Sequence, residues 1–362
     1  IDAKVDTGKV TGANVSIKID DEFMRSALEG RTYRQQFPIA AEEPTYVKDI
    51  DAKKLWDKII HNAWKSAEPG VLFWDTIIRE SVPDCYADQG FRTVSTNPCG
   101  EIPLCPYDSC RLLALNLLSY VDAPFTKEAK FNFEKFKEHV AMAMHLMDDI
   151  IDLELEKVEL IINKIASDPE DEDVRRVELE LWKKIKDMAL KGRRTGLGIT
   201  AEGDMLAALG LRYGSDEAID FTVNVHKTLA VEAYRASTMM AKDRGAFGVY
   251  NFEKEQGNPM VERICEAAPE LRELMKQYGR RNIAMLTIAP TGTTSLMSQT
   301  TSGIEPVFRP VYKRRRKINP SDKDQVASFV DETGEKFVEY FVFHHQFVKW
   351  LEINGYDTTK LQ

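Results

Sequence analysis

Segments with the pattern of β-strands alternate along this chain with stretches of helical periodicity. The strand-like segments span residues 13–19, 194–200 and 282–288. Apolar residues recur at helical spacing over residues 50–66, 136–151 and 216–242. The second of these helices begins near Phe133, and a charged helical stretch follows it to about Lys191. The last strand-like segment, NIAMLTI, runs directly into APTGTTS, which has the small and hydroxyl residues of a strand-to-helix turn. Strands separated by helices indicate an α/β fold with a largely parallel sheet, and no repeat or linker divides the chain.

Capping residues mark the ends of several predicted helices. Asp20 and Asp21 can cap a short helix that ends near Gly30, and the dipeptide at 69–70, proline then glycine, follows the helix over 50–66. The helix over 216–242 lies between a serine at 215 and a glycine at 245. These signals predict where helices begin and end.

The composition excludes some classes of function. The 362 residues are 43% hydrophobic, enough for one large domain or two smaller ones. The 49 basic and 58 acidic residues give a formal net charge of −9, which disfavours binding along a nucleic-acid backbone. No apolar run reaches the roughly 18 residues of a membrane span, and five cysteines, an odd number, fit a reducing compartment. We expect a globular cytoplasmic protein with no nucleic-acid or membrane partner.

The two ends of the sequence lack the signals of complete elements. The chain begins with Ile1, and its first ten residues have neither a helix cap nor a clear strand pattern. The last ten residues stop without a terminating element. We expect a fragment, a processed chain or a piece of a split gene.

Residues 84–109 contain three prolines and too few periodic apolar residues for a helix, so we expect an extended, irregular loop. Alternate side chains of an extended backbone share a face, which would align Asn97, Cys99 and Glu101 at steps of about 6 to 7 Å. An amide, a thiol and a carboxylate in one row suit a reaction at a sugar diol. The thiol can act on a carbon, the carboxylate on the proton of the adjacent hydroxyl, and the amide can orient the oxygen.

A purely structural role is the alternative for this pattern, with Cys99 as a small buried apolar residue and Glu101 as a surface charge. Two features favour the chemical interpretation. Cys110 lies eleven residues after Cys99, within reach if the loop folds back. Separately, APTGTTS has the form of a phosphate-binding turn, in which the N–H groups at a helix start favour an anion and Gly292 lets the backbone approach closely.

The sequences NPCGEI, YDSCRLLALNL and APTGTTSLMSQTTSGIEPVF follow one another in the order of a known family. They resemble the finger loop of adenosylcobalamin-dependent (class II) ribonucleotide reductases, and the phosphate-binding turn of these enzymes with its downstream GIEP. The resemblance extends to GANVSIKIDDEFM, RRTGLGIT and FHHQFVKWLEINGYD, so it covers essentially the whole chain. It implies the radical-based reduction of ribonucleotides to 2′-deoxyribonucleotides.

The resemblance implies a role for each matching residue. Cys99 corresponds to the residue that becomes a thiyl radical and removes the ribose 3′ hydrogen. Glu101 corresponds to the carboxylate that takes the 3′-hydroxyl proton as the 2′ oxygen leaves as water, and Asn97 to the amide that holds the hydroxyls. Cys110 corresponds to one member of a redox pair whose partner lies upstream of this region. The remaining matches are the substrate-binding Ser95 and Thr96, and the phosphate-binding Pro290, Thr291, Gly292, Thr293 and Thr294.

The same resemblance implies a ten-stranded α/β barrel of two parallel five-stranded halves, with Cys99 at the tip of a central finger loop. Residues 1–362 would form a single, partial catalytic barrel domain that lacks the upstream effector-reading region and the C-terminal cysteine tail. The implied cofactor is adenosylcobalamin. The implied partners are a ribonucleoside di- or triphosphate, a thioredoxin-type reductant and a second chain that supplies the missing N-terminal part, with a homodimer as an open alternative.

Other assignments within and outside the family stay open. Pro98 and Gly100, on either side of Cys99, match cobalamin-dependent members better than class I large subunits, which use a separate metallo-radical subunit. Class III enzymes lack the N-x-C-x-E pattern. The alternative outside the enzymes is an inactive fragment that serves as a binding or assembly module.

Several further motifs favour structural interpretations. Gly196, Gly198 and Ala201 spell a dinucleotide-type GxGxxA, but no acidic strand end follows, so we expect a close-packed turn. Asp148 and Asp152 in DDIID resemble a magnesium-diphosphate motif, and we interpret them as a solvated helix face. The cysteines form no CxxC pair, so no metal site is expected. We interpret Cys85 and Cys105 as structural, and Cys265 as a residue of a helix face or of the core.

The basic run KRRRK at 313–317 is interpreted as a solvated strand end, with a role near phosphates or cofactor left open. Three histidines are expected in the core: His139, His145 and His226. His344 and His345 lie in the matching stretch FHHQF, for which the resemblance implies no catalytic role.

Overall fold

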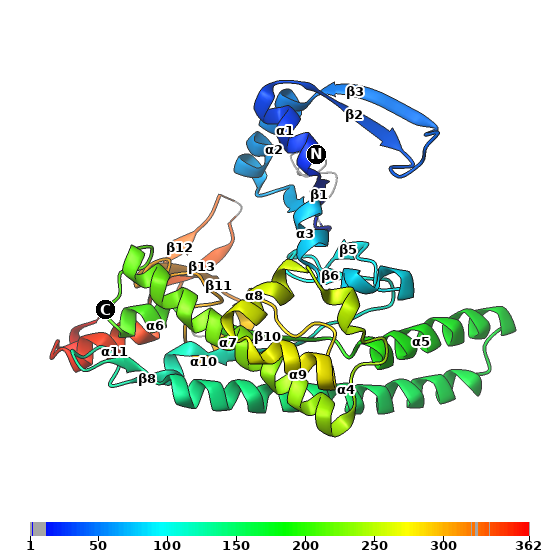
Figure 1. The fold of residues 1–362 in the computed structure, drawn as a ribbon. Helices are drawn as coiled ribbons and strands as arrows, with labels where there is room; N and C mark the ends of the chain where they lie inside the picture. The colour runs from blue at the N-terminus through cyan, green and yellow to red at the C-terminus, as the bar shows by residue number, and fades with distance from the viewer. Residues whose placement is uncertain (1, 3–11, 320, 323–324, 333, 362) are drawn as a thin grey trace. The chain divides into compact units, whose positions relative to one another are not determined.

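The computed structural model describes residues 2, 12–319, 321–322, 325–332 and 334–361. The chain divides into two compact units, whose helices and strands are labelled in Figure 1. The first unit comprises residues 1–108 and 251–263, and the second comprises residues 109–250 and 264–362. Helix α8 (Pro259–Ala267) crosses the boundary between them.

The first unit contains a small parallel sheet with a helical crossover. Strand β1 (Ser16–Ile19) pairs with β4 (Gly70–Phe73). The elements between them are α1 (Asp21–Glu29), β2 (Thr32–Phe37), β3 (Tyr46–Asp51) and α2 (Ala52–Ser66). Both predicted ends of α1 are confirmed, because the Asp20 carboxylate accepts from the Phe23 N–H and Gly30 takes a left-handed φ of 68°. The core of this part is formed by Ile19, Phe23, Ala27, Ala52 and Ile59.

The rest of the first unit is mostly irregular, as predicted for residues 84–109. Its elements are α3 (Trp74–Glu80), the 3₁₀ helices η2 (Pro83–Gln89) and η4 (Phe252–Glu255), and the two-residue strands β5 (Ser95–Thr96) and β6 (Pro103–Leu104). Buried Tyr86 holds distant segments of this unit together, since its hydroxyl donates to Glu255 at 2.6 Å and accepts from the Asn251 N–H at 3.1 Å. This contact explains why a segment from position 251 onward belongs to the first unit.

A parallel strand pair forms the centre of the second unit. Strands β7 (Arg111–Asn116) and β10 (Thr195–Thr200) run in register from Arg111 opposite Thr195 to Asn116 opposite Thr200. Every residue of β10 is buried, which confirms the strand predicted at 194–200. Because the pair is parallel, the carboxyl ends of both strands meet at one edge, which is where α/β proteins bind ligands.

The strand predicted at 282–288 forms only in part. The N–H groups of Thr195 and Leu197 donate to the carbonyls of Ala284 and Met285 at 3.0 and 2.7 Å, but only one ladder bridge forms. The prediction of a regular strand is therefore wrong. Pro290, which has no N–H to donate, ends the extended segment shortly after this pairing.

The long helix α4 (Phe133–Ala166) packs against both strands of this pair, and apolar periodicity explains it. Helix α4 begins at Asn132, whose side chain accepts from the Lys135 N–H, and continues with α5 (Glu172–Gly192) as a helical hairpin (Figure 1). The predicted apolar stripe of α4 is completely buried. The other helices of this unit are α6 (Glu202–Ala208), α7 (Asp216–Arg244), α9 (Glu270–Tyr278), α10 (Gly292–Ser298), α11 (His345–Ile353), η3 (Leu117–Tyr120) and η5 (Thr358–Lys360).

The remaining strands form small antiparallel sheets. They are β8 (Val121–Asp122) with β9 (Lys130–Phe131), and β11 (Val311–Lys317) and β12 (Phe329–Val330), which both pair with β13 (Lys336–Phe343). Within the described ranges the strands belong to six small sheets and no closed barrel is present. The α/β character is confirmed, whereas a ten-stranded barrel is not observed, since closure requires every strand to be paired on both sides. No helix in the described ranges is long and apolar enough to span a membrane.

Candidate active site

The segment around Cys99 is the tip of a β-hairpin in the first unit. Ser95 and Thr96 pair with Leu104 and Pro103 across the antiparallel strands β5 and β6. Beyond them the chain closes into a tight turn, in which the Gly100 N–H donates to the Asn97 carbonyl at 3.0 Å. The thiol of Cys99 is exposed at this tip.

The side chain of Asn97 closes the base of this turn. Its Oδ1 accepts from the Ile102 N–H at 3.0 Å, and the Asn97 N–H donates to the Ile102 carbonyl at 3.2 Å. The predicted extended row of side chains is therefore wrong in its geometry, because Pro98 favours a turn position and Gly100 supplies a φ of 89°. The hairpin still brings Asn97, Cys99 and half-buried Glu101 to one tip, and the exposure of Cys99 contradicts the alternative of a buried apolar role.

The hydroxyls of Ser95 and Thr96 lie at the base of the same hairpin. Thr96 donates to the Asn97 carbonyl at 2.9 Å, and Ser95 donates to the Thr96 carbonyl at 3.4 Å. Both hydroxyls therefore contribute to the shape of the backbone that presents Cys99.

Cys110 belongs to the second unit, directly before β7, and is half-buried. Its sulfur lies against Gly196 of β10, where a Cβ atom would overlap it and would come within 2.9 Å of the Thr287 methyl group. Gly198 is equally constrained, because a Cβ there would overlap the Thr287 carbonyl. The two glycines thus allow the predicted close packing, but they lie within strand β10, so the prediction of a turn at these positions is wrong.

All five cysteines lie in the described part of the chain, and no disulfide joins any two of them. Cys105 and Cys265 are buried, in agreement with the structural roles predicted for them, and Cys85 is half-buried. Cys99 is thus distinguished from the others by its exposure.

The predicted turn at 290–294 lies in the second unit, at the start of α10. Thr291 takes a left-handed φ of 50°, and its Oγ1 accepts from the Gly303 N–H at 2.7 Å. The same oxygen shares a hydrogen bond of 2.9 Å with the hydroxyl of Thr200, at the carboxyl end of β10. The Thr291 hydroxyl therefore shapes the turn from within, while Gly292, Thr293 and Thr294 are exposed.

Sequence reasoning did not identify the residues that support this turn. Asp204 of α6 is 2% exposed, and its Oδ2 accepts from the Thr301 N–H at 2.8 Å while its own N–H donates to the Thr301 hydroxyl at 3.1 Å. Its Oδ1 lies 2.7 Å from Nε2 of His344. Gly203 permits this approach, since a Cβ there would lie 2.6 Å from the Glu305 carbonyl. The signals in the sequence were the GIEP and FHHQF stretches, whose partner could not be deduced.

The same helix carries a second carboxylate–histidine pair. Glu202 of α6 is 5% exposed, and its Oε2 lies 2.7 Å from Nε2 of His226. Burial, together with the charges of Glu202 and Glu305, raises the pKa of Tyr213 above its ordinary value. The histidine predicted as a core residue at 226 is thus half-buried and bound to a carboxylate.

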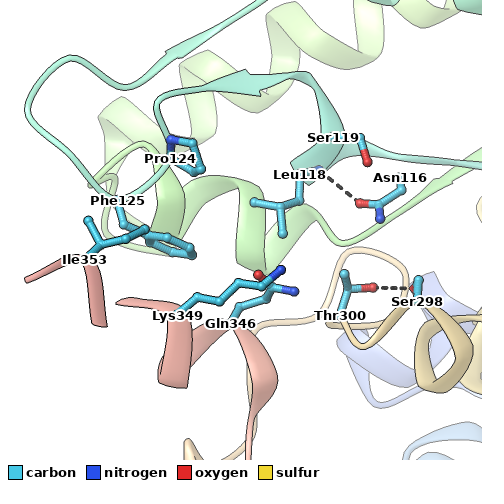
Figure 2. A pocket seen from close by; sticks show the side chains of 10 residues that line it. All are labelled: Asn116, Leu118, Ser119, Pro124, Phe125, Ser298, Thr300, Gln346, Lys349 and Ile353. Atoms are coloured by element: carbon cyan, nitrogen blue, oxygen red, sulfur yellow. Dashed lines mark hydrogen bonds between the residues drawn. The ribbon is translucent and has the colours of Figure 1, made fainter. Parts of the chain in front are cut away.

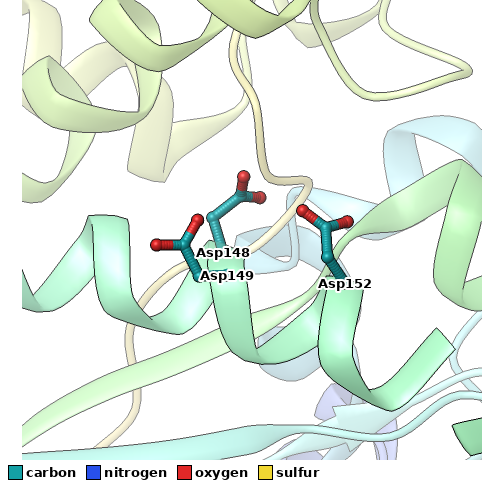
Figure 3. Close-up of side chains that lie close together, drawn as sticks. All are labelled: Asp148, Asp149 and Asp152. Carbon is teal, nitrogen blue, oxygen red and sulfur yellow. The ribbon is translucent and has the colours of Figure 1, made fainter. Parts of the chain in front are cut away.

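Asp148, Asp149 and Asp152 lie together on α4 (Figure 3). The interpretation of a solvated face is wrong for Asp148, which is completely buried. It accepts hydrogen bonds of 2.8 to 3.2 Å from Arg193, Arg244, Arg281 and Asn282.

Burial alone would raise the pKa of Asp148, but the hydrogen bonds and charges of Arg193 and Arg281 lower it below its ordinary value. Exposed Asp149 and Asp152 bind Arg244 and Arg193, at 2.7 and 2.8 Å. Arginines therefore engage all three carboxylates, and we interpret the cluster as an ion-pair hub.

The basic run at 313–317 forms β11, and its cations face carboxylates. Lys313 and Arg315 pair with Glu339 of β13, and Lys317 pairs with Glu335. The run is exposed along most of its length, which confirms the predicted strand on the surface.

A pocket of about 290 Å³ lies at the other end of α10 from the turn (Figure 2). Its wall includes Asn116 at the end of β7, Phe125, and Gln346 and Lys349 of α11. Gln346 donates to the Gln299 carbonyl at 3.0 Å, which attaches α11 to the segment after α10.

The chain belongs to the family of ribonucleotide reductase barrel domains, because the model of that family matches residues 1–333. It is 32% identical to the vitamin B12-dependent ribonucleoside-diphosphate reductase of Thermoplasma acidophilum over 83% of this chain and 32% of that protein. It is 30% identical to the enzyme of the same name from Mycobacterium tuberculosis, over 83% of this chain and 36% of that protein. This chain thus spans about a third of the length of these relatives.

Two further similarities concern other members of the family. The ribonucleoside-diphosphate reductase subunit alpha of Chlamydia pneumoniae is 27% identical over 73% of this chain and 24% of that protein. Among solved structures, the class Id ribonucleotide reductase alpha subunit of Actinobacillus ureae superposes with a TM-score of 0.53 at 20% identity, over 81% of this chain and 43% of that one. This last similarity concerns the fold alone.

Proposed function

We propose that this chain is the catalytic-barrel portion of a class II ribonucleotide reductase, which reduces ribonucleotides to 2′-deoxyribonucleotides with adenosylcobalamin. The observation that carries the proposal is the exposed thiol of Cys99 at the tip of a hairpin, in a chain that matches the family over residues 1–333. The names of the Thermoplasma and Mycobacterium relatives support the vitamin B12-dependent class. A class I large subunit is the alternative that the Chlamydia relative favours.

Each functional residue of the hairpin would have its own role in the reaction at the ribose. The Cys99 sulfur, as a thiyl radical, would take the 3′ hydrogen atom, and its position at an exposed tip leaves room for a sugar. Glu101 would accept the 3′-hydroxyl proton as the 2′ oxygen leaves as water. Since Oδ1 of Asn97 is engaged by the Ile102 N–H, its Nδ2 would donate to a ribose oxygen. Ser95 and Thr96 would complete the substrate site.

Two regions of the second unit would serve the same reaction. Cys110 and a second thiol would supply two electrons and two protons and form a disulfide, which a thioredoxin-type reductant would then reduce. Residues 290–294 would hold the phosphates of a ribonucleoside di- or triphosphate through the N–H groups at the start of α10. Thr293 and Thr294 would present their exposed hydroxyls to these phosphates.

The residues present fit the proposed cofactor, because a radical generator must reach the thiol and Cys99 is exposed. When bound, adenosylcobalamin supplies a carbon-centred radical through homolysis of its cobalt–carbon bond. The part of Cys99 in that chemistry is to give up the hydrogen atom on Sγ.

We also propose that residues 1–362 act as one portion of a ten-stranded barrel in which β7 and β10 are neighbours. The remaining strands, the effector-reading region and the C-terminal cysteine tail would come from sequence beyond this region or from a second chain. The fraction of the relatives that this chain spans supports this arrangement. Assembly as a homodimer is part of the same proposal.

Substitution of Cys99 tests the function. In the complete enzyme with adenosylcobalamin and a dithiol reductant, Cys99→Ser should abolish the conversion of a ribonucleoside diphosphate to its 2′-deoxy product. Cys85→Ser, at a half-buried cysteine outside the hairpin, should retain activity. Full activity of Cys99→Ser would refute the assignment.

A spectral measurement separates the alternatives. The class II enzyme should form cob(II)alamin from adenosylcobalamin without any partner protein, whereas a class I subunit should form none and should require a metallo-radical protein. An assembly module would neither bind nucleotide nor reduce it.

A further inference from the structure

We propose that Asp204 is a positioning residue for the phosphate-binding turn, which it holds through the loop at 301–303. The inference rests on the proposed function, because it concerns the turn at 290–294 that would receive the substrate phosphates. It assigns a specific task to a carboxylate that is nearly fully buried and that bonds to Thr301 and His344.

Asp204 and Thr301 are joined by two hydrogen bonds. The Thr301 N–H donates to Oδ2 of Asp204 at 2.8 Å, and the Asp204 N–H donates to the Thr301 hydroxyl at 3.1 Å. The bond to the carboxylate is charge-assisted and lies in a buried environment, which makes it stronger than a neutral hydrogen bond. The position of residue 301 is therefore determined by α6, the helix that follows β10.

The same loop then determines the conformation of Thr291. The Gly303 N–H donates to Oγ1 of Thr291 at 2.7 Å, and the Thr200 hydroxyl bonds both to that oxygen and to the Thr301 carbonyl, at 2.9 and 3.2 Å. Thr291 has a φ of 50°, which a β-branched residue rarely adopts and which its surroundings must stabilise. A continuous set of hydrogen bonds thus connects Asp204 to the residue at which the turn reverses.

His344 orients the carboxylate that makes these contacts. Its Nε2 lies 2.7 Å from Oδ1 of Asp204, on the side opposite Oδ2. With one oxygen bound to His344 and the other to the Thr301 N–H, the carboxylate cannot rotate without loss of a bond. The FHHQF stretch therefore acquires a physical role, as the support of Asp204.

Glu202 provides a natural comparison within the same helix. It lies two residues before Asp204 in the first turn of α6, is 5% exposed and also binds a histidine, His226, at 2.7 Å. Among the described residues, however, its carboxylate makes no hydrogen bond to the loop at 301–303. The two carboxylates share burial and a histidine partner, and differ in their connection to the turn.

The experiment compares Asp204→Asn with Glu202→Gln in the complete enzyme. For each variant, calorimetry gives the Kd of cytidine diphosphate and of cytidine, and steady-state assays give KM and kcat. Asp204→Asn should raise the Kd and the KM of the diphosphate about tenfold, with the Kd of cytidine and kcat changed less than about twofold. Glu202→Gln should leave the diphosphate Kd within about twofold of wild type.

The failures of the two proposals are distinguishable. If the double variant Thr293→Ala/Thr294→Ala binds the diphosphate as tightly as wild type, the hydroxyls of the assigned turn do not hold phosphate and that part of the proposed function is wrong. If that double variant weakens binding but Asp204→Asn binds like wild type, the positioning role is refuted while the proposed function stands. Equal weakening of diphosphate and nucleoside by Asp204→Asn, or equal effects of both carboxylate variants, would also refute it.

Thr200→Val decides the question if Asp204→Asn does not fold. This substitution keeps the shape of a buried side chain and removes the hydroxyl that joins Thr291 to the Thr301 carbonyl. It should weaken diphosphate binding about threefold and leave cytidine binding unchanged. If this variant folds and its affinity for the diphosphate does not fall selectively, the inference is overturned.

Discussion

The hairpin around Cys99 and the turn at 290–294 are built in opposite ways. The hairpin is shaped by bonds between close neighbours in sequence, such as Asn97 to Ile102, five positions apart. The turn is shaped by bonds from Thr200, which is 91 positions from Thr291, and by Asp204, which is 97 positions from Thr301. The conformation of the hairpin is thus determined by residues within a short segment, whereas the conformation of the turn is determined by distant residues of the second unit.

This difference predicts which part of the molecule a substitution in each region should affect. A change in the hairpin should alter the presentation of the thiol and leave the second unit intact. A change in the packing around β10 should alter both the stability of the second unit and the geometry of the turn. The four predictions below test this contrast, from the largest expected effect to the smallest.

The largest effect is expected from Asp148→Ala. The substitution leaves the guanidinium groups of Arg193 and Arg281 in a buried site without their carboxylate, which typically costs about 3 to 5 kcal/mol. The free energy of unfolding, measured by denaturant titration, should fall by this amount. The matched control is Asp149→Ala, an exposed partner of Arg244, which should cost less than about 1 kcal/mol. If both substitutions lowered the free energy of unfolding equally, the buried ion pairs of Asp148 would not stabilise the second unit.

A smaller loss is expected when a methyl group is added on β10. Gly198→Ala would drive a Cβ into the Thr287 carbonyl, so the free energy of unfolding should fall by about 1 to 3 kcal/mol. Gly196→Ala should cost less, because the overlapping Cys110 sulfur belongs to a side chain that can move. Gly292→Ala enters open space and should leave thermal stability unchanged. The reverse order would contradict the close packing of residues 283–287 on β10.

A local effect is expected from Asn97→Ala. The Ile102 N–H would lose its side-chain acceptor, which should destabilise the hairpin by about 1 kcal/mol. Hydrogen exchange at the amides of residues 100–102 should accelerate, while exchange over 195–200 stays the same. Asn97→Asp keeps an acceptor and should exchange like wild type. Faster exchange in β10 would show that the hairpin is not locally determined.

The smallest effect is the pH dependence of the hub. Because the folded state lowers the pKa of Asp148 from its ordinary value of 3.8, the unfolded state binds its proton more readily. Its contribution is therefore present above that ordinary pKa and is lost as pH falls through the folded pKa, by at most about 1.4 kcal/mol per pH unit. The difference in unfolding free energy between wild type and Asp148→Asn should shrink between pH 5 and pH 3. A constant difference would refute the shift.

Local signals predicted much of the secondary structure. The caps at Asp20 and Gly30, the apolar stripe of α4 and the strand at 195–200 all follow from residues within a few positions of one another. In the candidate site, Pro98 and Gly100 already contain the information for a turn. These turn residues override the alternation that predicts an extended row.

Long-range contacts account for what the sequence did not reveal. Residues 282–288 have the composition of a strand, but only one ladder bridge to β10 forms before Pro290, which has no N–H to donate. Asp148 lies in a polar stretch typical of a surface, yet it is completely buried because arginines from three other segments converge on it.

By itself, the sequence determined the order of helices and strands, the hairpin-forming residues around Cys99 and the family to which the chain belongs. Only the tertiary structure decided that Thr291 uses its hydroxyl inside the turn and that Asp204 and His344 support that turn. The physical reason is the separation in sequence between the residues that interact. Caps and turns depend on neighbours along the chain, whereas a buried carboxylate is stable only where folding brings donors to it from about a hundred residues away.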